Sequence, residues 1–291
     1  MIIALIKSMR PRQWPKNVFV LAALVFDRQL THPVALLRSV IGFVLFCLLS
    51  SSVYLINDVM DVESDRVHPT KRNRPIASGK LPIPEAIAAA SIIVVVTLVI
   101  SYFLSPLFFF IAFGYFLSNL LYSKWLKHVP LIDVLILASG FVLRVAAGVS
   151  LINVQRFSPW LYVVTTLIAL YIGFGKRRAE LVLLEDNANS HRAVLQSYSL
   201  PLLDQLITIV SAMTIMAYSM YTFSAPNVPD NHTMMLTIPF VIYGIFRYLY
   251  LIQIKHSGGA PEELVFSDRP LQVTVLLFGL SVLVVFYFFT K

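Results

Sequence analysis

The chain has little charge and almost no cysteine. Of its 291 residues only 13% are Asp, Glu, Lys or Arg, whereas 58% are hydrophobic. Soluble domains carry roughly 25% charged residues, so this chain has too little polar surface to cover the two soluble domains that its length would suggest. Cys47 is the single cysteine, which excludes an intrachain disulfide scaffold. The composition also excludes a disordered or collagen-like chain. The charges that remain sum to +8, and their positions need an explanation.

Long apolar runs occupy most of the chain. A membrane-spanning helix needs about 20 mostly apolar residues. Eight stretches meet this requirement clearly, and a shorter one at 15–30, which contains Asp27 and Arg28, is a candidate for a ninth span. Ser105-Pro106 predicts a helical hairpin within one long uncharged run, because proline ends a helix. The eight clear spans are predicted at 37–57, 85–104, 106–123, 130–151, 158–175, 201–223, 233–252 and 270–289.

The basic residues favour the ninth span. With nine helices, most of the 23 Lys and Arg residues fall on the side that receives the N-terminus and the loops 58–84, 124–129, 176–200 and 253–269. Cytoplasmic loops carry such an excess, so this side is predicted to face the cytoplasm. The expected fold class is all-α: a polytopic membrane helical bundle of about nine transmembrane helices around a central cavity open to the cytoplasm. Residues 1–291 are expected to form a single integral-membrane domain, with no nucleic-acid partner and an undetermined oligomeric state.

An acidic cluster follows the span 37–57. Asn57, Asp61 and Asp65 recur every four residues, on one face of a helix, and Asp58 adjoins them. Carboxylates this close repel one another, so a cation is expected among them. Mg²⁺ takes one or two carboxylates and shares its other positions with phosphates and water. A solvated acidic helix end is the alternative, but the position at the membrane boundary favours a metal site formed by these four residues.

Basic residues follow the acidic cluster in the same loop. Arginine and lysine bind phosphate oxygens, so this order of acid and then base predicts a site for a Mg²⁺-diphosphate. The alternative is that the positive charge reflects topology and attracts anionic lipid. The candidate residues are Arg66, Lys71, Arg72 and Arg74.

Other candidates lie at or within the remaining spans. Lys176, Arg177 and Glu180 come directly after the span 158–175, although Lys176 and Glu180 are spaced to pair with each other. Arg144 lies inside a span, where a charge faces a bundle interior or a wet cavity and indicates function. Asp133 lies about three turns earlier on the same face, and we expect both residues to line one cavity.

Two further segments combine basic and aromatic residues. Tyr122 and Lys127 lie in one such turn and are candidate substrate-binding residues. The alternative is an interfacial aromatic belt with snorkelling lysines. Lys16 lies at the start of the first helix, and a helix N-terminus favours anions. The alternative there is an interfacial anchor at Trp14.

Three features resemble the UbiA-type intramembrane prenyltransferase superfamily over essentially the whole chain. They are the Asn-Asp-x-x-Asp-x-x-x-Asp motif at 57–65, the nine predicted spans, and the Arg-Pro-x-Gln-Trp-x-Lys-Asn start at 10–17. Segments 65–77 and 175–181 more closely resemble the decaprenyl-phosphate phosphoribosyltransferase branch. The second Asp-x-x-x-Asp motif of aromatic prenyltransferases is missing, and the superfamily's Tyr-x-x-x-Lys motif is imperfect, since Leu126 is the fourth residue after Tyr122.

The resemblance implies a Mg²⁺-dependent transfer of 5-phosphoribose from phosphoribosyl diphosphate to a polyprenyl phosphate. It places the enzyme in the plasma (inner) membrane with its active site facing the cytoplasm, where it serves cell-envelope polysaccharide synthesis. An aromatic or quinone prenyltransferase is the alternative, and a transporter is a third reading. We hypothesise that the acidic cluster holds Mg²⁺ on the diphosphate and that the following basic residues contact the leaving group or the ribose. Lys176, Arg177 and Glu180 are assigned to the 5-phosphate and a ribose hydroxyl, and Lys16 and Arg144 to the lipid phosphate.

Overall fold

The computed structural model describes residues 1–68, 71–154, 158–185, 193–255, 264 and 267–289. The chain forms two compact units, which are described separately. Unit 1 consists of Met1–Lys124 and Leu143–Val154, and unit 2 of Trp125–Val142 and Gln155–Lys291. The described residues contain helices and no strand, which confirms the all-α prediction.

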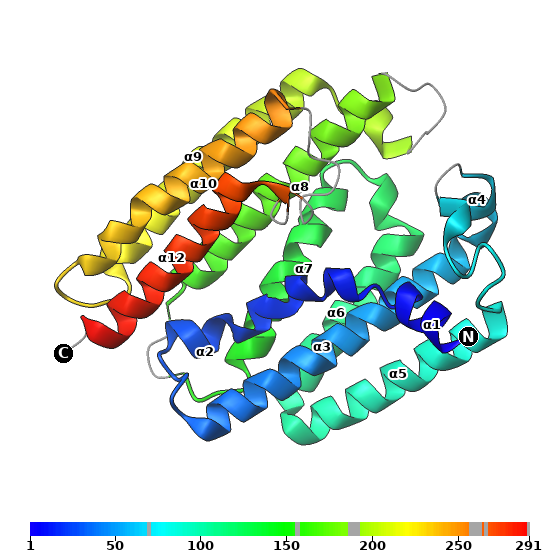
Figure 1. Cartoon of the computed structure of the whole chain (residues 1–291), viewed down its shortest axis with the longest axis horizontal. Helices are drawn as coiled ribbons and strands as arrows, with labels where there is room; N and C mark the ends of the chain where they lie inside the picture. The colour runs from blue at the N-terminus through cyan, green and yellow to red at the C-terminus, as the bar shows by residue number, and fades with distance from the viewer. Residues whose placement is uncertain (69–70, 155–157, 186–192, 256–263, 265–266, 290–291) are drawn as a thin grey trace. The chain divides into compact units, whose positions relative to one another are not determined.

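Unit 1 is built around its longest helix, α3 (Pro33–Met60). The helices α5 and α6 pack against α3, and Figure 1 shows α2 and the preceding segment alongside it. Phe46 on α3 and Phe108 on α6 are fully buried in the core, with their rings 5.6 Å apart. The other elements of this unit are α1 (Ile2–Ser8), the 3-10 helix η1 (Pro11–Leu21), α2 (Ala22–Phe26), α4 (Val62–Val67), the 3-10 helix η2 (Lys71–Asn73), α5 (Ile83–Leu104), α6 (Pro106–Lys124) and the second part of α7 (Ile132–Val149).

Unit 2 contains the first part of α7 and the C-terminal helices. The helices α8 and α9 pack closely, and α10 packs against α9 and α12. Its core includes Val134, Tyr171, Leu203 and Ile252. The elements are the 3-10 helix η3 (Leu126–His128), α8 (Trp160–Glu185), the 3-10 helix η4 (Ala193–Ser197), α9 (Leu200–Ser224), the 3-10 helix η5 (Thr233–Thr237), α10 (Ile238–Gln253) and α12 (Arg269–Phe288).

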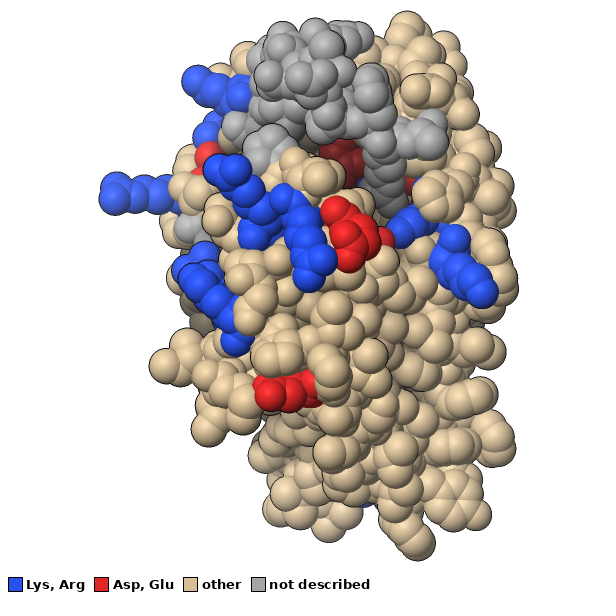
Figure 2. Space-filling model, turned by 90° about the vertical axis from the view of Figure 1, so that its right-hand side faces the viewer, with Lys and Arg blue, Asp and Glu red and all other residues tan. Residues whose placement is uncertain are grey.

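Seven helical segments in the described part of the chain are long and apolar enough to cross a membrane, and they match seven of the predicted spans. Their outer surfaces expose large apolar side chains, such as Phe103 (82% exposed) and Phe110. On the face drawn in Figure 2, most charged side chains gather in the upper part and leave a broad uncharged surface below. Lipid tails, rather than water, suit such a surface.

Two helices continue past the predicted ends of their membrane spans. The helix α3 continues to Met60 and α8 continues to Glu185, so Asn57, Asp58 and the segment 176–185 are helical and do not lie in loops. The physical reason is that Lys, Arg, Glu, Ala and Leu are good helix formers. The first charged residues therefore end an apolar run without ending its helix.

Residues 15–26 of the predicted span 15–30 are helical, but most of them are not α-helical. They belong to η1, an 11-residue 3-10 helix that begins at Pro11, and to the five residues of α2. A 3-10 helix rises about 2.0 Å per residue against 1.5 Å for an α-helix, so the two together extend roughly 30 Å. That equals the thickness of the hydrocarbon core of a bilayer. The length therefore allows a ninth span, and the count of nine stays a prediction.

Close packing against α7 accompanies the unusual form of η1. The backbone of Val20 lies directly on Gly148: a Cβ atom at Gly148 would come within 2.0 Å of the Val20 carbonyl oxygen. Only glycine leaves room for this approach. At this point the backbones of α7 and η1 therefore touch each other directly.

Candidate active site

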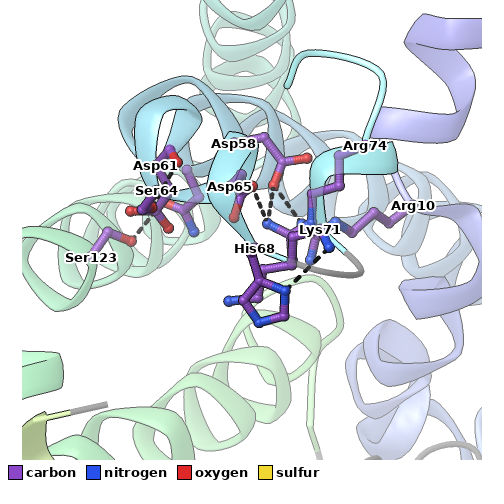
Figure 3. Close-up of polar contacts among 10 residues, drawn as sticks. Arg10, Asp58, Asp61, Ser64, Asp65, His68, Lys71, Arg74 and Ser123 are labelled. Carbon is purple, nitrogen blue, oxygen red and sulfur yellow. Dashed lines mark hydrogen bonds and ion pairs between the residues drawn. The ribbon is translucent and has the colours of Figure 1, made fainter. Parts of the chain in front are cut away.

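Two buried carboxylates share one arginine at the end of α3. Asp58, in the last turn of α3, is only 3% exposed, and Asp65 on α4 is equally buried. The guanidinium of Arg74 donates to both of them, with Nη1 lying 3.1 Å from Asp58 Oδ1 and 2.7 Å from Asp65 Oδ2. Figure 3 shows this bridge. The positive charge of Arg74 thus offsets the mutual repulsion of the two carboxylates.

The predicted single acidic face is divided in the structure. The helix α3 ends at Met60 and α4 begins at Val62, with the single residue Asp61 between them. Asn57 accepts a hydrogen bond from Ser123 Oγ at 2.6 Å. In Figure 3 Asp61 lies on the side of Ser123, apart from the pair that faces Arg74. The helix is thus interrupted at one residue, and the proposal that the four residues form one metal site stays a prediction.

Arg10 is a site residue that sequence reasoning missed. Its Nη2 donates to Asp58 Oδ1 at 2.5 Å, and its guanidinium lies 4.8 Å from the ring centre of Tyr54. The indole N–H of Trp14 donates to Ser51 Oγ at 3.0 Å, and that hydroxyl lies 2.9 Å from the Met9 carbonyl oxygen. The helix α3 thus anchors the segment on both sides of Arg10. A separation of 48 residues hides this pairing from any local pattern.

We expect Arg10→Met to lower kcat/KM about 10- to 100-fold, the usual cost of removing a side chain that holds a ligand-binding side chain in its orientation. The reason is that Asp58 would lose one of its two arginines. Arg12→Met is the matched control, because Arg12 is exposed two residues away. Steady-state kinetics of the three purified proteins would check this, and equal losses in both variants would contradict it.

The other predicted basic residues of the loop 58–84 are exposed to solvent. Arg66 is exposed and pairs with Glu63 on the same helix at 3.0 Å. Lys71 and Arg72 belong to η2 and are exposed. Of the four basic candidates in this loop, Arg74 alone has a described contact with the buried carboxylates. The remaining candidates Lys16 (η1), Tyr122 (α6), Lys127 (η3) and Lys176 (α8) are half-buried.

Arg144 belongs to a buried network inside unit 1. Its Nε donates to Asn17 Oδ1 and its Nη2 to the hydroxyl of Tyr115, both at 2.8 Å. Asn17, which is fully buried, also donates to Ser50 Oγ at 3.2 Å. Asp133 instead bonds within unit 2. The described partners of Arg144 and of Asp133 lie within their own units, and the expectation that the two residues line one cavity stays a prediction.

The second charged cluster lies in unit 2. Arg177 Nε donates to Asp133 Oδ2 at 2.6 Å, and Arg177 Nη1 donates to Glu180. Tyr198 donates to Asp133 Oδ1 at 2.7 Å. Burial, together with this bond to a carboxylate, raises the pKa of Tyr198 to about 12. The hydroxyl therefore stays protonated, and remains a donor, throughout the physiological pH range.

The acidic cluster offers the right donor atoms for Mg²⁺. The ion prefers oxygen ligands from one or two carboxylates, and Asp58 and Asp65 present such oxygens in a place that already accommodates cationic groups. Within the described residues no three His, Cys, Asp or Glu side chains converge as a ready metal site. The chemistry of the donor set fits the ion, whereas the four-residue ligand set stays a prediction.

Comparison with known proteins places these features in a family. The model of the UbiA prenyltransferase family matches residues 17–267. The chain belongs to this family. It is 36% identical to the decaprenyl-phosphate phosphoribosyltransferase of Mycolicibacterium smegmatis, over 95% of this chain and 90% of that protein. The decaprenyl-phosphate phosphoribosyltransferase of Corynebacterium glutamicum is 34% identical over 97% of this chain and 86% of that protein.

The UbiA family fold is also evident in solved structures. A UbiA homologue from Archaeoglobus fulgidus, bound to GPP and Mg²⁺, superimposes with a TM-score of 0.74 at 18% sequence identity. The match covers 97% of this chain and 99% of that one. The sequence-based assignment to the UbiA superfamily and to a multi-pass membrane protein is therefore confirmed.

Proposed function

We propose that this UbiA family member transfers 5-phosphoribose from 5-phosphoribosyl 1-diphosphate to a polyprenyl phosphate and releases diphosphate. The observation that carries the proposal is the similarity to two phosphoribosyltransferases over nearly the full length of the chain. The reaction would take place at the cytoplasmic face of the plasma (inner) membrane and supply precursors of cell-envelope polysaccharide. The cluster around Asp58 and Arg74 supports the donor class, because it combines carboxylates for a metal with arginines for phosphate.

The proposed magnesium ligands are Asn57, Asp58, Asp61 and Asp65. When bound, Mg²⁺ would offset the negative charge that develops on the departing diphosphate. Arg74 and Arg10 are well suited to bind the same leaving group, because each guanidinium has five N–H donors in a planar fork. Lys71 and Arg72 lie exposed on η2, where they would add cationic contacts.

The remaining chemistry makes few demands on the protein. Positive charge develops on the ribose ring as its C1–O bond breaks, as in other glycosyl transfers. The acceptor phosphate is already an anion, so no strong general base is needed and the chain has only to position it. We propose attack from the face opposite the diphosphate, with inversion at C1. Lys16 remains a proposed contact of the lipid phosphate. Arg144 is held by Asn17 and Tyr115, which favours a role in fixing η1.

A comparison of two donors in separate reactions tests the function. Purified protein in detergent receives labelled phosphoribosyl diphosphate, polyprenyl phosphate and Mg²⁺ in one reaction, and a prenyl diphosphate with an aromatic acid in another. We expect a labelled phosphoribosyl lipid in the first reaction and no product in the second. Product in the second reaction alone would establish the aromatic prenyltransferase alternative, which the family as a whole also allows.

A further inference from the structure

Two arginines and two carboxylates form a charge-balanced group at the end of α3. Arg10 Nη2 lies 2.5 Å and Arg74 Nη1 lies 3.1 Å from the same atom, Asp58 Oδ1. Arg74 Nη1 also lies 2.7 Å from Asp65 Oδ2. Both guanidinium groups therefore meet at one carboxylate oxygen (Figure 3). Because the two positive and two negative charges cancel, this group of four has no excess negative charge to attract a further cation.

The arginines cover the carboxylates. The side chains of Asp58 and Asp65 are each 3% exposed, whereas those of Arg10 and Arg74 are 30% and 29% exposed. A phosphate group that arrives from solvent therefore meets guanidinium N–H groups, which bind its oxygens. A metal ion that arrives alone meets the same positive charges, which repel it. This surface thus favours an anion and disfavours a free cation.

The main chain around Arg10 is fixed on both sides. Arg10 has a φ of 53°, a left-handed conformation that a residue with a Cβ atom rarely adopts and that is common at functional sites. The Ser51 hydroxyl accepts from the Trp14 indole N–H at 3.0 Å and lies 2.9 Å from the Met9 carbonyl oxygen. The arginine side chain has many rotamers, so its guanidinium can change partners while this backbone stays in place.

An aromatic ring gives the Arg10 guanidinium a second support. The carbon at its centre lies 4.8 Å from the centre of the Tyr54 ring, a separation at which the ring face attracts a cation. This attraction does not depend on the anion that the guanidinium binds. Tyr54 therefore keeps the guanidinium near Asp58 when the ion pair between Arg10 and Asp58 is broken.

We propose that Arg10 is an exchangeable partner of Asp58 that makes the binding of Mg²⁺ depend on the diphosphate of the donor. Arg10 pairs with Asp58 until a diphosphate arrives, and its guanidinium then transfers to phosphate oxygens, which leaves Asp58 available to the metal ion. The negative charge of the diphosphate restores the balance that the metal ion alone would upset. The inference rests on the proposed function for Asp58 as a metal ligand and for a diphosphate donor.

Binding measurements without turnover test the exchange. Purified protein in detergent is dialysed against a chelator, and Mn²⁺, which suits the same oxygen ligands as Mg²⁺, is titrated in alone and followed by the EPR signal of the free ion. We expect Arg10→Met to bind Mn²⁺ alone about 10-fold more tightly than the wild type does. That is the smaller effect that one opposite charge within about 4–6 Å has on the affinity of a carboxylate for a proton.

A second measurement uses labelled inorganic diphosphate at saturating Mg²⁺, with equilibrium dialysis as the readout. Arg10→Met should bind this diphosphate about 10-fold more weakly, the cost of one lost hydrogen bond to a charged group. The opposite signs of the two changes distinguish partner exchange from a folding defect, which would weaken both affinities. Unchanged or weaker Mn²⁺ binding would overturn the proposal, and so would diphosphate binding as tight as in the wild type.

Two further variants serve as controls. Arg12→Met removes an exposed arginine two residues away and should keep both affinities. Asp58→Asn, added to Arg10→Met, should abolish the gain in Mn²⁺ affinity, because that gain depends on the released carboxylate. A gain that persists in the double variant, or an equal gain in Arg12→Met, would place the ion elsewhere and contradict the exchange.

The result can be separated from the fate of the proposed function. Phosphoribosyl and prenyl donors both carry a diphosphate, so the two binding measurements do not depend on the group that is transferred. If the wild type uses only a prenyl donor, sugar transfer is refuted, whereas opposite changes in Arg10→Met would still support the exchange. If the wild type transfers phosphoribose and the opposite changes are absent, the proposed function stands and the exchange is refuted.

Discussion

We expect Asp61→Asn to lower kcat/KM for phosphoribosyl transfer about 10³-fold, because the loss of the proposed metal ligand would remove several kcal/mol of transition-state stabilisation. The thermal unfolding midpoint should stay at the wild-type value. The reason is that Asp61 lies outside the pair of carboxylates that Arg74 joins. Steady-state kinetics at saturating Mg²⁺ and thermal unfolding in the same detergent would measure both quantities.

Two comparison variants sharpen this prediction. Glu63→Gln removes an exposed carboxylate two residues away, whose described partner is Arg66 on the same helix, and should leave kcat/KM unchanged. Asp58→Asn should lower both the activity and the unfolding midpoint, since Arg10 and Arg74 would lose a buried partner. A near wild-type rate for Asp61→Asn would remove Asp61 from the metal site.

We expect Gly148→Ala to destabilise the protein by about 3 kcal/mol, at the upper end of the usual cost of overpacking. Alanine is the better helix former, so local propensity alone predicts the opposite sign. The new methyl group would lie 2.0 Å from the Val20 carbonyl oxygen, and a backbone atom cannot turn aside as a side chain can. The segment η1 must move, and with it the bond between Asn17 and Arg144.

Gly114→Ala is the control for this prediction. Gly114 lies in α6 and has no atom within 4 Å of the position that a Cβ would take. The same substitution there should stabilise the protein slightly, by about 0.4–1 kcal/mol. Thermal unfolding of both variants in one detergent would give the two shifts. Similar shifts in the same direction would contradict the close contact between η1 and α7.

The apolar composition of long stretches was enough to predict the membrane spans but not where the helices end. Apolar runs of about 20 residues correctly located seven helices, since burial in lipid depends on total hydrophobicity. The helices α3 and α8 continue past the predicted ends of their spans, because charged residues continue a helix as readily as apolar ones. The 3-10 form of η1 depends on the contact between Val20 and Gly148, two residues far apart in the sequence.

The candidate site was predicted in its chemistry and less well in its geometry. The sequence placed Arg74, Asp58 and Asp65 in one candidate site, and the structure brings the three together, whereas their roles toward Mg²⁺ and the diphosphate stay predictions. The sequence shows which residues are charged but not which are buried. Arg177 was therefore assigned to a phosphate, although its side chain is 1% exposed. Arg10 was missed because its partner lies 48 residues away.

The partition of phosphorus labels between products tests the central claim most directly. Phosphoribosyl diphosphate is prepared with one label on its 5-phosphate and a second, distinguishable label on its diphosphate, and is incubated with the protein, polyprenyl phosphate and Mg²⁺. We predict that the 5-phosphate label enters the lipid phase while the diphosphate label appears as free diphosphate, in equal molar amounts. Diphosphate label in the lipid, or no label transferred to the lipid, would contradict phosphoribosyl transfer.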